Sequence, residues 1–225
     1  MADVRTLPRN AGSTEAGGIA INRVLRNTYL LLGLTLAFSA VVAMVAMATQ
    51  APYLGPIPTL VGFLGLLFLV HKTADSAWGL LTVFIFTGFL GYSLGPILNV
   101  YLSLPNGGAL IGQAFGLTAA AFVGLSGYAL VTRKDFSFLS GFLVVGAIVL
   151  LGAIVLSIFV EISGLQLAIS SAMVLFASAL ILFETSNVIH GGETNYIRAT
   201  VGLYVSIYHL FTSLLHLLGV FSGDD

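Results

Sequence analysis

The sequence contains no cysteine among its 225 residues, which excludes disulfide bridges and thiolate chemistry. Charge is also scarce, because Asp, Glu, Lys and Arg make up only 8% of the chain, whereas a soluble domain carries about a quarter. So few charged side chains cannot cover a water-exposed surface. The formal net charge of −1 offers no basic surface to a nucleic acid, and we expect no nucleic-acid partner.

Hydrophobic residues take the place of the missing charge. They make up 58% of the chain, and the mean hydropathy is +1.05. The apolar runs are continuous and near twenty residues long, which is the length that a helix needs to cross hydrocarbon. Outer-membrane barrels alternate apolar and polar residues in segments of about ten instead. The sequence therefore predicts an all-α membrane protein embedded in a lipid bilayer.

Seven transmembrane helices are predicted. We place them at about residues 29–48, 57–71, 78–99, 109–131, 137–160, 164–186 and 198–220. The first run is longer than the roughly 7–15 apolar residues of a secretory signal, so we interpret it as a retained span. The domain organisation is then a disordered cytoplasmic tail over residues 1–22, a transmembrane domain over 23–221 and a short outer tail over 222–225.

The distribution of basic residues supports this count. With the N-terminus inside, all eight basic residues fall on the inner side: Arg5, Arg9, Arg23, Arg26, Lys72, Arg133, Lys134 and Arg198. The outer loops hold none and carry Glu161, Asp224 and Asp225 instead. This is the positive-inside distribution, and a model with six or eight spans would break it. We therefore expect a cytoplasmic N-terminus and a periplasmic C-terminus.

Small residues recur at four-residue spacing on two of the spans. The third span carries Thr87, Gly91 and Gly95, and the fourth carries Gly112, Gly116, Ala120 and Gly124. Small side chains at this spacing let helix backbones approach each other closely. We expect both stripes to face a neighbouring helix, as a packing feature without chemistry.

The last span carries a polar stripe along one helical face. Its members are Gly202, Ser206, His209, Ser213 and His216, at steps of four, three, four and three. A helix at the rim of a bundle would expose such a stripe to lipid, so we place the last helix at the centre. The stripe suits either a path for an ion or hydrogen bonding between helices, which is common in bundles.

Glu184 is the leading candidate for a functional residue, because ionisable groups inside spans are rare and usually functional. Burial would favour its protonated form, so Glu184, Ser206 and His209 are our candidates for sensing a proton or a cation. Arg198, His190 and Glu193 are possible partners at the inner face. The alternative is a carboxylate at headgroup level that pairs with Arg198 or Lys134.

Other chemistry is disfavoured. Glu184, His190 and Glu193 lack the closely spaced histidines of a zinc site, so we expect no metal and no cofactor. Gly91–Gly95 matches a hydrolase nucleophile elbow, but it lies inside a span rather than at a strand-to-helix turn. Gly124–Gly127 resembles a rhomboid serine motif, yet the sixth span offers no histidine as a base before His190. We expect no enzymatic activity.

Several stretches resemble the Bax inhibitor-1 family. Phe183–His190 is similar to the family's acid-Thr-Gln signature, Asn195–Ala199 to its acid-Tyr-Ile loop, and Leu203–Ser206 to its Leu-Phe-Leu-Asp segment. Thr87–Asn99 and Arg26–Tyr29 fit as well. The resemblance is closest to the bacterial YccA branch, covers about residues 22–220, and implies seven spans around a central last helix.

The resemblance implies two activities. The YccA branch is similar to inner-membrane proteins that bind the membrane protease FtsH and its HflK–HflC companions and restrain FtsH as slow substrates, pulled by the N-terminal tail. Other branches are pH-sensitive calcium leaks that need one acid on each of the last two spans. Glu184 matches the first acid, but Ser206 stands at the second position, so we rank a calcium or proton leak below protease modulation.

Overall fold

The computed structural model describes residues 11–160, 162 and 164–222, with side chains from Ile19 onward. This part of the chain forms seven α-helices and no strand. The helices are α1 (Ala11–Ala48), α2 (Pro56–Thr73), α3 (Gly79–Leu102), α4 (Gly107–Thr132), α5 (Leu139–Phe159), α6 (Leu165–Ile189) and α7 (Tyr196–Ser222). Each is long and apolar enough to cross a membrane, so the predicted all-α membrane fold with seven spans is confirmed.

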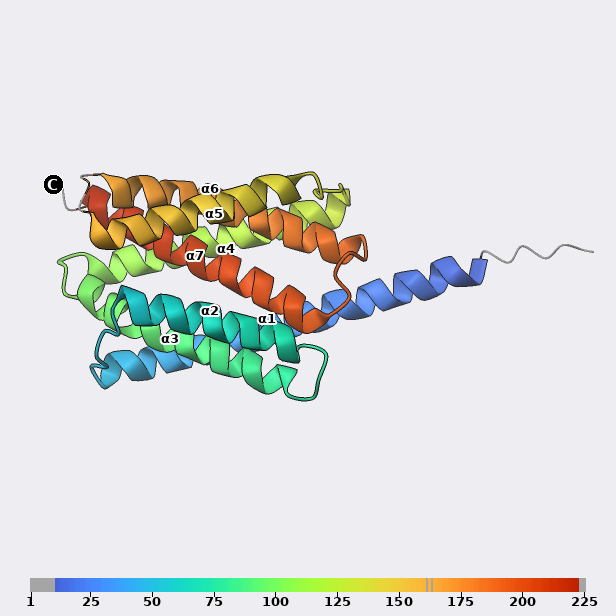
Figure 1. Ribbon diagram of the computed structural model, residues 1–225, viewed down its shortest axis with the longest axis horizontal. Helices are drawn as coiled ribbons and strands as arrows, with labels where there is room; N and C mark the ends of the chain where they lie inside the picture. Colours follow the sequence, from blue (N-terminus) through green and yellow to red (C-terminus); the bar gives the residue numbers. More distant parts are fainter. Residues whose placement is uncertain (1–10, 161, 163, 223–225) are drawn as a thin grey trace, which may run out of the picture.

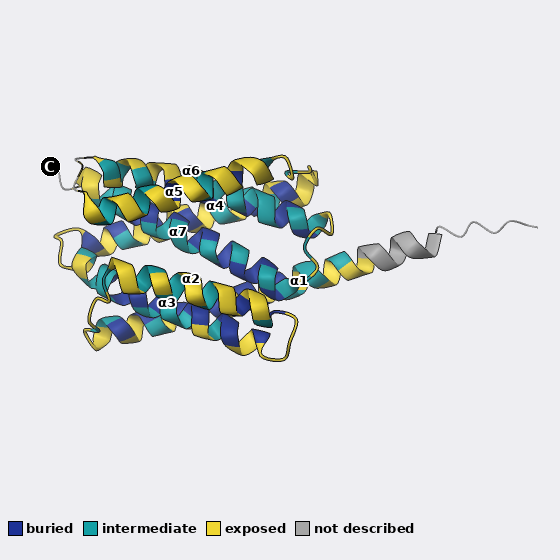
Figure 2. Cartoon of the chain, in the orientation of Figure 1, coloured by how far each residue is buried: buried dark blue, intermediate teal, exposed yellow. Residues whose placement is uncertain are grey.

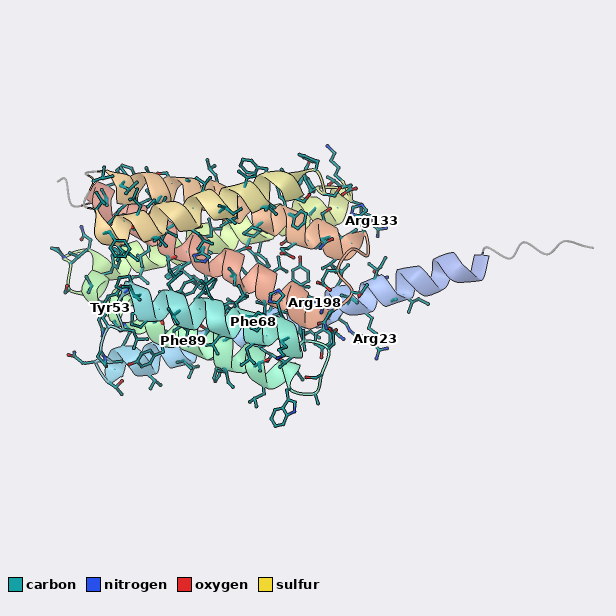
Figure 3. All side chains as sticks on the ribbon, in the orientation of Figure 1. Arg23, Tyr53, Phe68, Phe89, Arg133 and Arg198 are labelled. Carbon is teal, nitrogen blue, oxygen red and sulfur yellow. The ribbon has the colours of Figure 1, made fainter. Side chains whose placement is uncertain are left out.

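The helices run up and down, and α7 lies between two groups. Helices α1, α2 and α3 lie on one side of it, and α4, α5 and α6 lie on the other (Figure 1). The connections α2–α3, α4–α5 and α6–α7 meet at one end of the bundle, which we call the basic end. Arg23, Arg133 and Arg198 gather there, whereas Tyr53 lies at the opposite end (Figure 3). The membrane side that this end faces stays a prediction.

The last helix is central, as predicted. It contributes to each of the three buried apolar clusters, through residues that include Tyr204, Leu210 and Leu215. Every residue from Tyr196 to Gly219 is buried or half-buried, whereas α2 and α5 present many exposed apolar residues (Figure 2). A helix that is buried on all sides lies in the core of its bundle, and the other six helices are therefore arranged around α7.

Helix α1 begins earlier than the sequence boundary suggested. It starts at Ala11, so residues 11–22, which we expected to belong to a disordered tail, are helical, and this end of α1 projects past the other helices (Figure 1). The segment holds no proline, and a helix nucleated in the membrane extends at one hydrogen bond per added residue. The remaining expected tails, residues 1–10 and 223–225, lie outside the described residues.

The two stripes of small residues differ in whether they contact a neighbouring helix. A Cβ atom built on Gly95 of α3 would lie 2.5 Å from the Ala46 side chain of α1, and one built on Gly91 would overlap the Ser39 carbonyl oxygen. The prediction of close approach is thus confirmed for α3. For α4 it is wrong, because nothing among the described residues lies within 4 Å of such an atom at Gly112, Gly116 or Gly124.

The reason lies in the composition of α4. Its packed face is formed by Leu110, Ala114, Thr118, Ser126 and Ala129. Gly112 and Gly116 stand two residues beyond Leu110 and Ala114, which is about 200° around a helix and therefore nearly the opposite face. Small residues occupy both faces, so spacing alone did not tell which face packs.

Candidate functional site

Glu184 lies one to two turns before the end of α6 and packs against α7. A Cβ atom built on Gly202 would lie 2.6 Å from the carboxyl carbon of Glu184 and 2.6 Å from its Oε1. No real side-chain carbon tolerates such a contact, so the glycine provides the space that the carboxyl group occupies. Gly202 therefore positions Glu184 between the two last helices.

Ser206 and His209 follow Gly202 on the same face of α7. Ser206 is fully buried, and its hydroxyl donates to the Gly202 carbonyl oxygen at 2.8 Å. The His209 ring packs edge-on against Phe63 of α2, with 5.7 Å between the ring centroids. These two residues thus extend the Glu184 contact toward the middle of the bundle, and we call Glu184, Gly202, Ser206 and His209 the α6–α7 seam.

Glu184 has no polar partner in the part of the chain that the structure describes. The two ion pairs found there both belong to Arg198, which binds Asp75 and Glu193. No hydrogen bond joins Glu184 to Ser206 or His209 among these residues. The carboxyl group is therefore held by packing against Gly202 and not by a charge at headgroup level.

The residues expected at the inner face form two separate polar clusters at the basic end. The first, which we call the latch, joins the α6–α7 connection to the α2–α3 turn. Arg198 Nη1 donates to Asp75 Oδ2 at 2.8 Å, and Asn195 Nδ2 donates to Asp75 Oδ1 at 2.7 Å and to the Ala74 carbonyl at 2.9 Å. Glu193 holds the other side of the Arg198 guanidinium, with Oε2 3.2 Å from Nε.

Asp75 stays charged in this setting. The hydrogen bond from Asn195, followed by that from Arg198, lowers the pKa of Asp75 below its ordinary value. A carboxyl group whose pKa is lowered by folding contributes stability above its ordinary pKa and loses it only as the pH falls through the lowered value. The latch therefore does not respond to pH near neutrality.

The second cluster, which we call the clamp, joins α6 to the α4–α5 connection. The Ser186 hydroxyl donates to the Lys134 carbonyl at 3.1 Å and accepts from the Phe136 amide at 3.0 Å. His190 Nε2 lies 3.1 Å from the Arg133 carbonyl oxygen. Three contacts thus fix one short connection to the last turn of α6.

The polar stripe of α7 also includes a bond to a neighbouring helix. His216 Nδ1 lies 2.9 Å from Ser170 Oγ on α6. On another face of α7, the Tyr204 hydroxyl lies 2.6 Å from Ser39 Oγ on α1 and donates to the Thr87 carbonyl of α3 at 3.3 Å. Interhelical hydrogen bonding therefore accounts for part of the polarity of α7, as one of the two interpretations expected.

Sequence reasoning missed the residues that connect the loops. Asp75, Asn195 and Ser186 drew no attention as contacts, and Gly202 was noted only as part of the stripe. One local signal was available, because an asparagine just before an apolar helix is a typical N-cap. Asn195 fills that role for α7, since its Oδ1 accepts from the Ile197 amide at 2.8 Å. The pairing with Asp75 spans 120 residues and left no local signal.

The fold and this site define a class of protein: a polytopic α-helical membrane protein whose last helix is central and holds a carboxyl group of the preceding helix. Among the described residues no three His, Asp or Glu side chains lie close enough to hold a metal ion. The family model "Inhibitor of apoptosis-promoting Bax1" matches residues 21–223. The chain therefore belongs to the Bax inhibitor-1 family.

Relatives match nearly the whole chain. The "Modulator of FtsH protease YccA" of Escherichia coli K12 is 55% identical over 206 residues, which is 92% of this chain and 94% of that protein. The "Inner membrane protein YccA" of a second Escherichia coli strain has the same identity and coverage. An uncharacterized protein of Pseudomonas aeruginosa is 60% identical over 205 residues, with coverage of 91% and 92%.

Proposed function

We propose that this chain is a non-enzymatic inner-membrane protein that binds FtsH and restrains it, as a slowly degraded substrate. The observation that carries the proposal is the 55% identity, over 92% of the chain, to a protein named as a modulator of FtsH protease. The basic end would face the cytoplasm, in agreement with the positive-inside rule. HflK and HflC, as companions of FtsH, are the expected neighbours in the complex.

The N-terminal part of the chain is the proposed handle for the protease. Helix α1 begins at Ala11 and projects from the basic end, away from the packed helices (Figure 1). A helix end that projects beyond its neighbours opens more easily than helices packed in a core, so a protease can engage this part while the bundle resists unfolding. Slow degradation then follows from the contrast between an accessible handle and a stable bundle.

Removal of the handle should strengthen the restraint. We expect the full chain to prolong the lifetime of a known FtsH membrane substrate in cells. A variant that lacks most of residues 1–22 but keeps Arg23 and Arg26 for topology should be long-lived and prolong that lifetime further, because it occupies the protease without being consumed. The measurement is a chase of both the substrate and the chain after synthesis is stopped.

A matched control separates the handle from mere length. A variant with the order of residues 2–22 shuffled keeps the length and charge of the segment, and it should be degraded like the full chain if any accessible segment serves. If neither the full nor the shortened chain changes the lifetime of the substrate while both accumulate in the membrane, the modulator function is wrong.

The α6–α7 seam favours a second candidate function, a proton- or calcium-linked leak. Glu184 lies inside a span without a polar partner among the described residues, and such carboxyl groups usually serve transport. A second acid is missing, because the corresponding position of α7 is Ser206, whose hydroxyl donates a hydrogen bond to the Gly202 carbonyl oxygen. A single carboxylate offers few of the six to eight oxygens that calcium takes, so a proton is the favoured ion.

Two substitutions test the leak. Glu184→Gln keeps the shape of the side chain and removes its charge, so it should abolish flux that depends on this group. Gly202→Ala keeps the charge but forces the carboxyl group from its position, and it should change the rate in the same assay. The measurement is proton and calcium flux into liposomes, with Gly116→Ala on the open face of α4 as the matched control.

The two functions separate cleanly in these assays. Glu184→Gln should leave protease modulation intact if the handle carries it, while flux falls. If Glu184→Gln and Gly202→Ala liposomes both leak like the wild type, the seam conducts no ion. Such a result leaves the protease experiment to decide the modulator function by itself.

A further inference from the structure

His190 faces carbonyl oxygens with both of its ring nitrogens. Nδ1 lies 2.9 Å from the carbonyl oxygen of Ser186, one turn back in α6, and Nε2 lies 3.1 Å from the carbonyl oxygen of Arg133 at the end of α4. A carbonyl oxygen only accepts hydrogen bonds. A neutral imidazole carries one N–H and the imidazolium carries two, so only the charged ring satisfies both contacts.

The neutral ring always loses a contact of the clamp. If the proton is on Nδ1, the Nε2 lone pair faces the Arg133 oxygen and that bond is lost. If it is on Nε2, the Nδ1 lone pair faces the Ser186 oxygen. Among the described residues, the other donor near Nδ1 is the Ser186 hydroxyl, at 3.3 Å, and turning it to Nδ1 takes it away from the Lys134 carbonyl.

The backbone at the end of α4 places this contact beside a residue in an unusual conformation. Arg133 adopts a left-handed conformation with φ of 49°, which non-glycine residues rarely adopt and which persists only where surrounding structure holds it. Its carbonyl group points at His190, and the next carbonyl accepts from Ser186. The clamp thus holds the connection beside this left-handed residue, and the loss of one bond removes one of its three contacts.

The charges around His190 oppose each other. From the α4–α5 connection, Arg133 and Lys134 disfavour the imidazolium. Asp135 favours it and is close enough for the histidine charge to stabilise its carboxylate. The C-terminal end of α6 favours a cation through its helix dipole. Glu184, six residues earlier on α6, and Glu193 in the α6–α7 connection are the acidic residues nearest to His190 in the sequence.

We propose that His190 is a pH-sensitive switch that fastens the α4–α5 connection to α6 when it is protonated and releases it when it is neutral. The clamp depends on how many protons the imidazole carries, whereas the latch depends on a charge that persists at neutral pH. On the predicted orientation the switch faces the cytoplasm. His190 lies six residues from Glu184 in the sequence. The switch does not depend on either of the proposed functions.

Hydrogen exchange of the full-length protein in lipid nanodiscs tests the switch. The amide of Phe136, which donates to Ser186 Oγ, should exchange faster at pH 8 than at pH 5.5 after correction for the intrinsic rate. The expected change is about two- to tenfold, as for the loss of one hydrogen bond. His190→Gln, which retains a donor but cannot change charge, should remove this pH dependence.

His71 provides the matched control. Its Nδ1 lies 2.9 Å from the Leu67 carbonyl in the last turn of α2, as His190 does in α6, but no second carbonyl faces its other nitrogen among the described residues. His71→Gln should therefore leave the pH dependence of the α4–α5 connection unchanged. Corrected exchange that is equal at both pH values in the wild type, or a dependence that survives in His190→Gln, overturns the proposal.

A spectroscopic measurement covers the case in which His190→Gln disturbs the fold. In wild-type protein with 15N-labelled histidine, both ring nitrogens of His190 should carry protons in the clamped form at pH 5.5, and one should lose its proton as the connection loosens. Assignment of the signal can use a His190→Asn variant as well as His190→Gln. A ring that stays neutral at pH 5.5 while the Phe136 amide is protected contradicts the switch.

Discussion

Gly91→Ala should destabilise the bundle by about 1–3 kcal/mol or more, because it places a methyl group into a backbone contact. The added carbon would overlap the Ser39 carbonyl oxygen and lie 2.9 Å from Ser39 Oγ. Both atoms belong to α1, and the carbonyl is part of the α1 backbone, so a rotamer change cannot relieve the overlap. Helices α1 and α3 must move apart, and the contacts that Tyr204 makes to both of them weaken together.

The same substitution at Gly116 is the control. Nothing among the described residues lies within 4 Å of a carbon added there, and alanine is up to about 1 kcal/mol more favourable than glycine inside a helix. Gly116→Ala should therefore be neutral or mildly stabilising. Unfolding by increasing SDS in mixed micelles measures both variants, and equal midpoints would contradict the assignment of the packed face on α3.

The sequence was sufficient to predict the fold because the membrane constrains it strongly. Every backbone polar group in hydrocarbon must be satisfied within the chain, so long apolar runs become helices. The stripe at Ser206, His209 and Ser213 then predicted which helix is central, since polar groups avoid lipid. The beginning of α1 was predicted less well, because at Ala11 the chain is outside the apolar run and hydropathy no longer limits the helix.

The site was predictable only where its residues are unusual for their surroundings. Glu184 stands out because a carboxylate in a span is rare. Its contact with Gly202 pairs residues on different helices, and a glycine that makes room for a carboxyl group looks the same in sequence as one that packs a backbone. Gly116 is the opposite case. Its spacing is typical of helix packing, but no neighbouring helix contacts it among the described residues.

The loop contacts were beyond sequence reasoning for another reason. Asp75 and Arg198 meet across 123 residues, and His190 meets a main-chain carbonyl that any residue at position 133 could supply. Because a contact to a main-chain carbonyl does not require a particular side chain, the sequence of the partner does not reveal it. Only the three-dimensional arrangement of the basic end brings the three connections within hydrogen-bonding distance.

These contacts divide the basic end into two parts that we expect to respond differently to pH. The latch holds α7 to the α2–α3 turn through charges that persist at neutral pH, since hydrogen bonds lower the pKa of Asp75. The clamp holds α6 to the α4–α5 connection through a histidine. Helices α6 and α7, which enclose Glu184, are therefore each joined at this end to a different half of the bundle.

Tyr204→Ala should be among the most damaging single substitutions in the chain. Tyr204 is the largest fully buried side chain of the described residues, and its ring meets Phe86 of α3 edge-on with centroids 6.2 Å apart. Removal of a buried aromatic ring costs about 3–5 kcal/mol. Tyr204→Phe retains the ring and loses only the bonds to Ser39 and Thr87, and interhelical hydrogen bonds in membranes are worth about 0.6 kcal/mol on average.

The difference between the two variants separates packing from hydrogen bonding in the core. Tyr53→Ala is the control, since that side chain is 60% exposed and lies at the opposite end from the latch and the clamp (Figure 3). Unfolding in mixed micelles should give a large loss for Tyr204→Ala, a small loss for Tyr204→Phe and almost none for Tyr53→Ala. If Tyr204→Phe loses as much as Tyr204→Ala, the hydroxyl bonds between α7, α1 and α3, and not the packing of α7, hold the centre of the bundle.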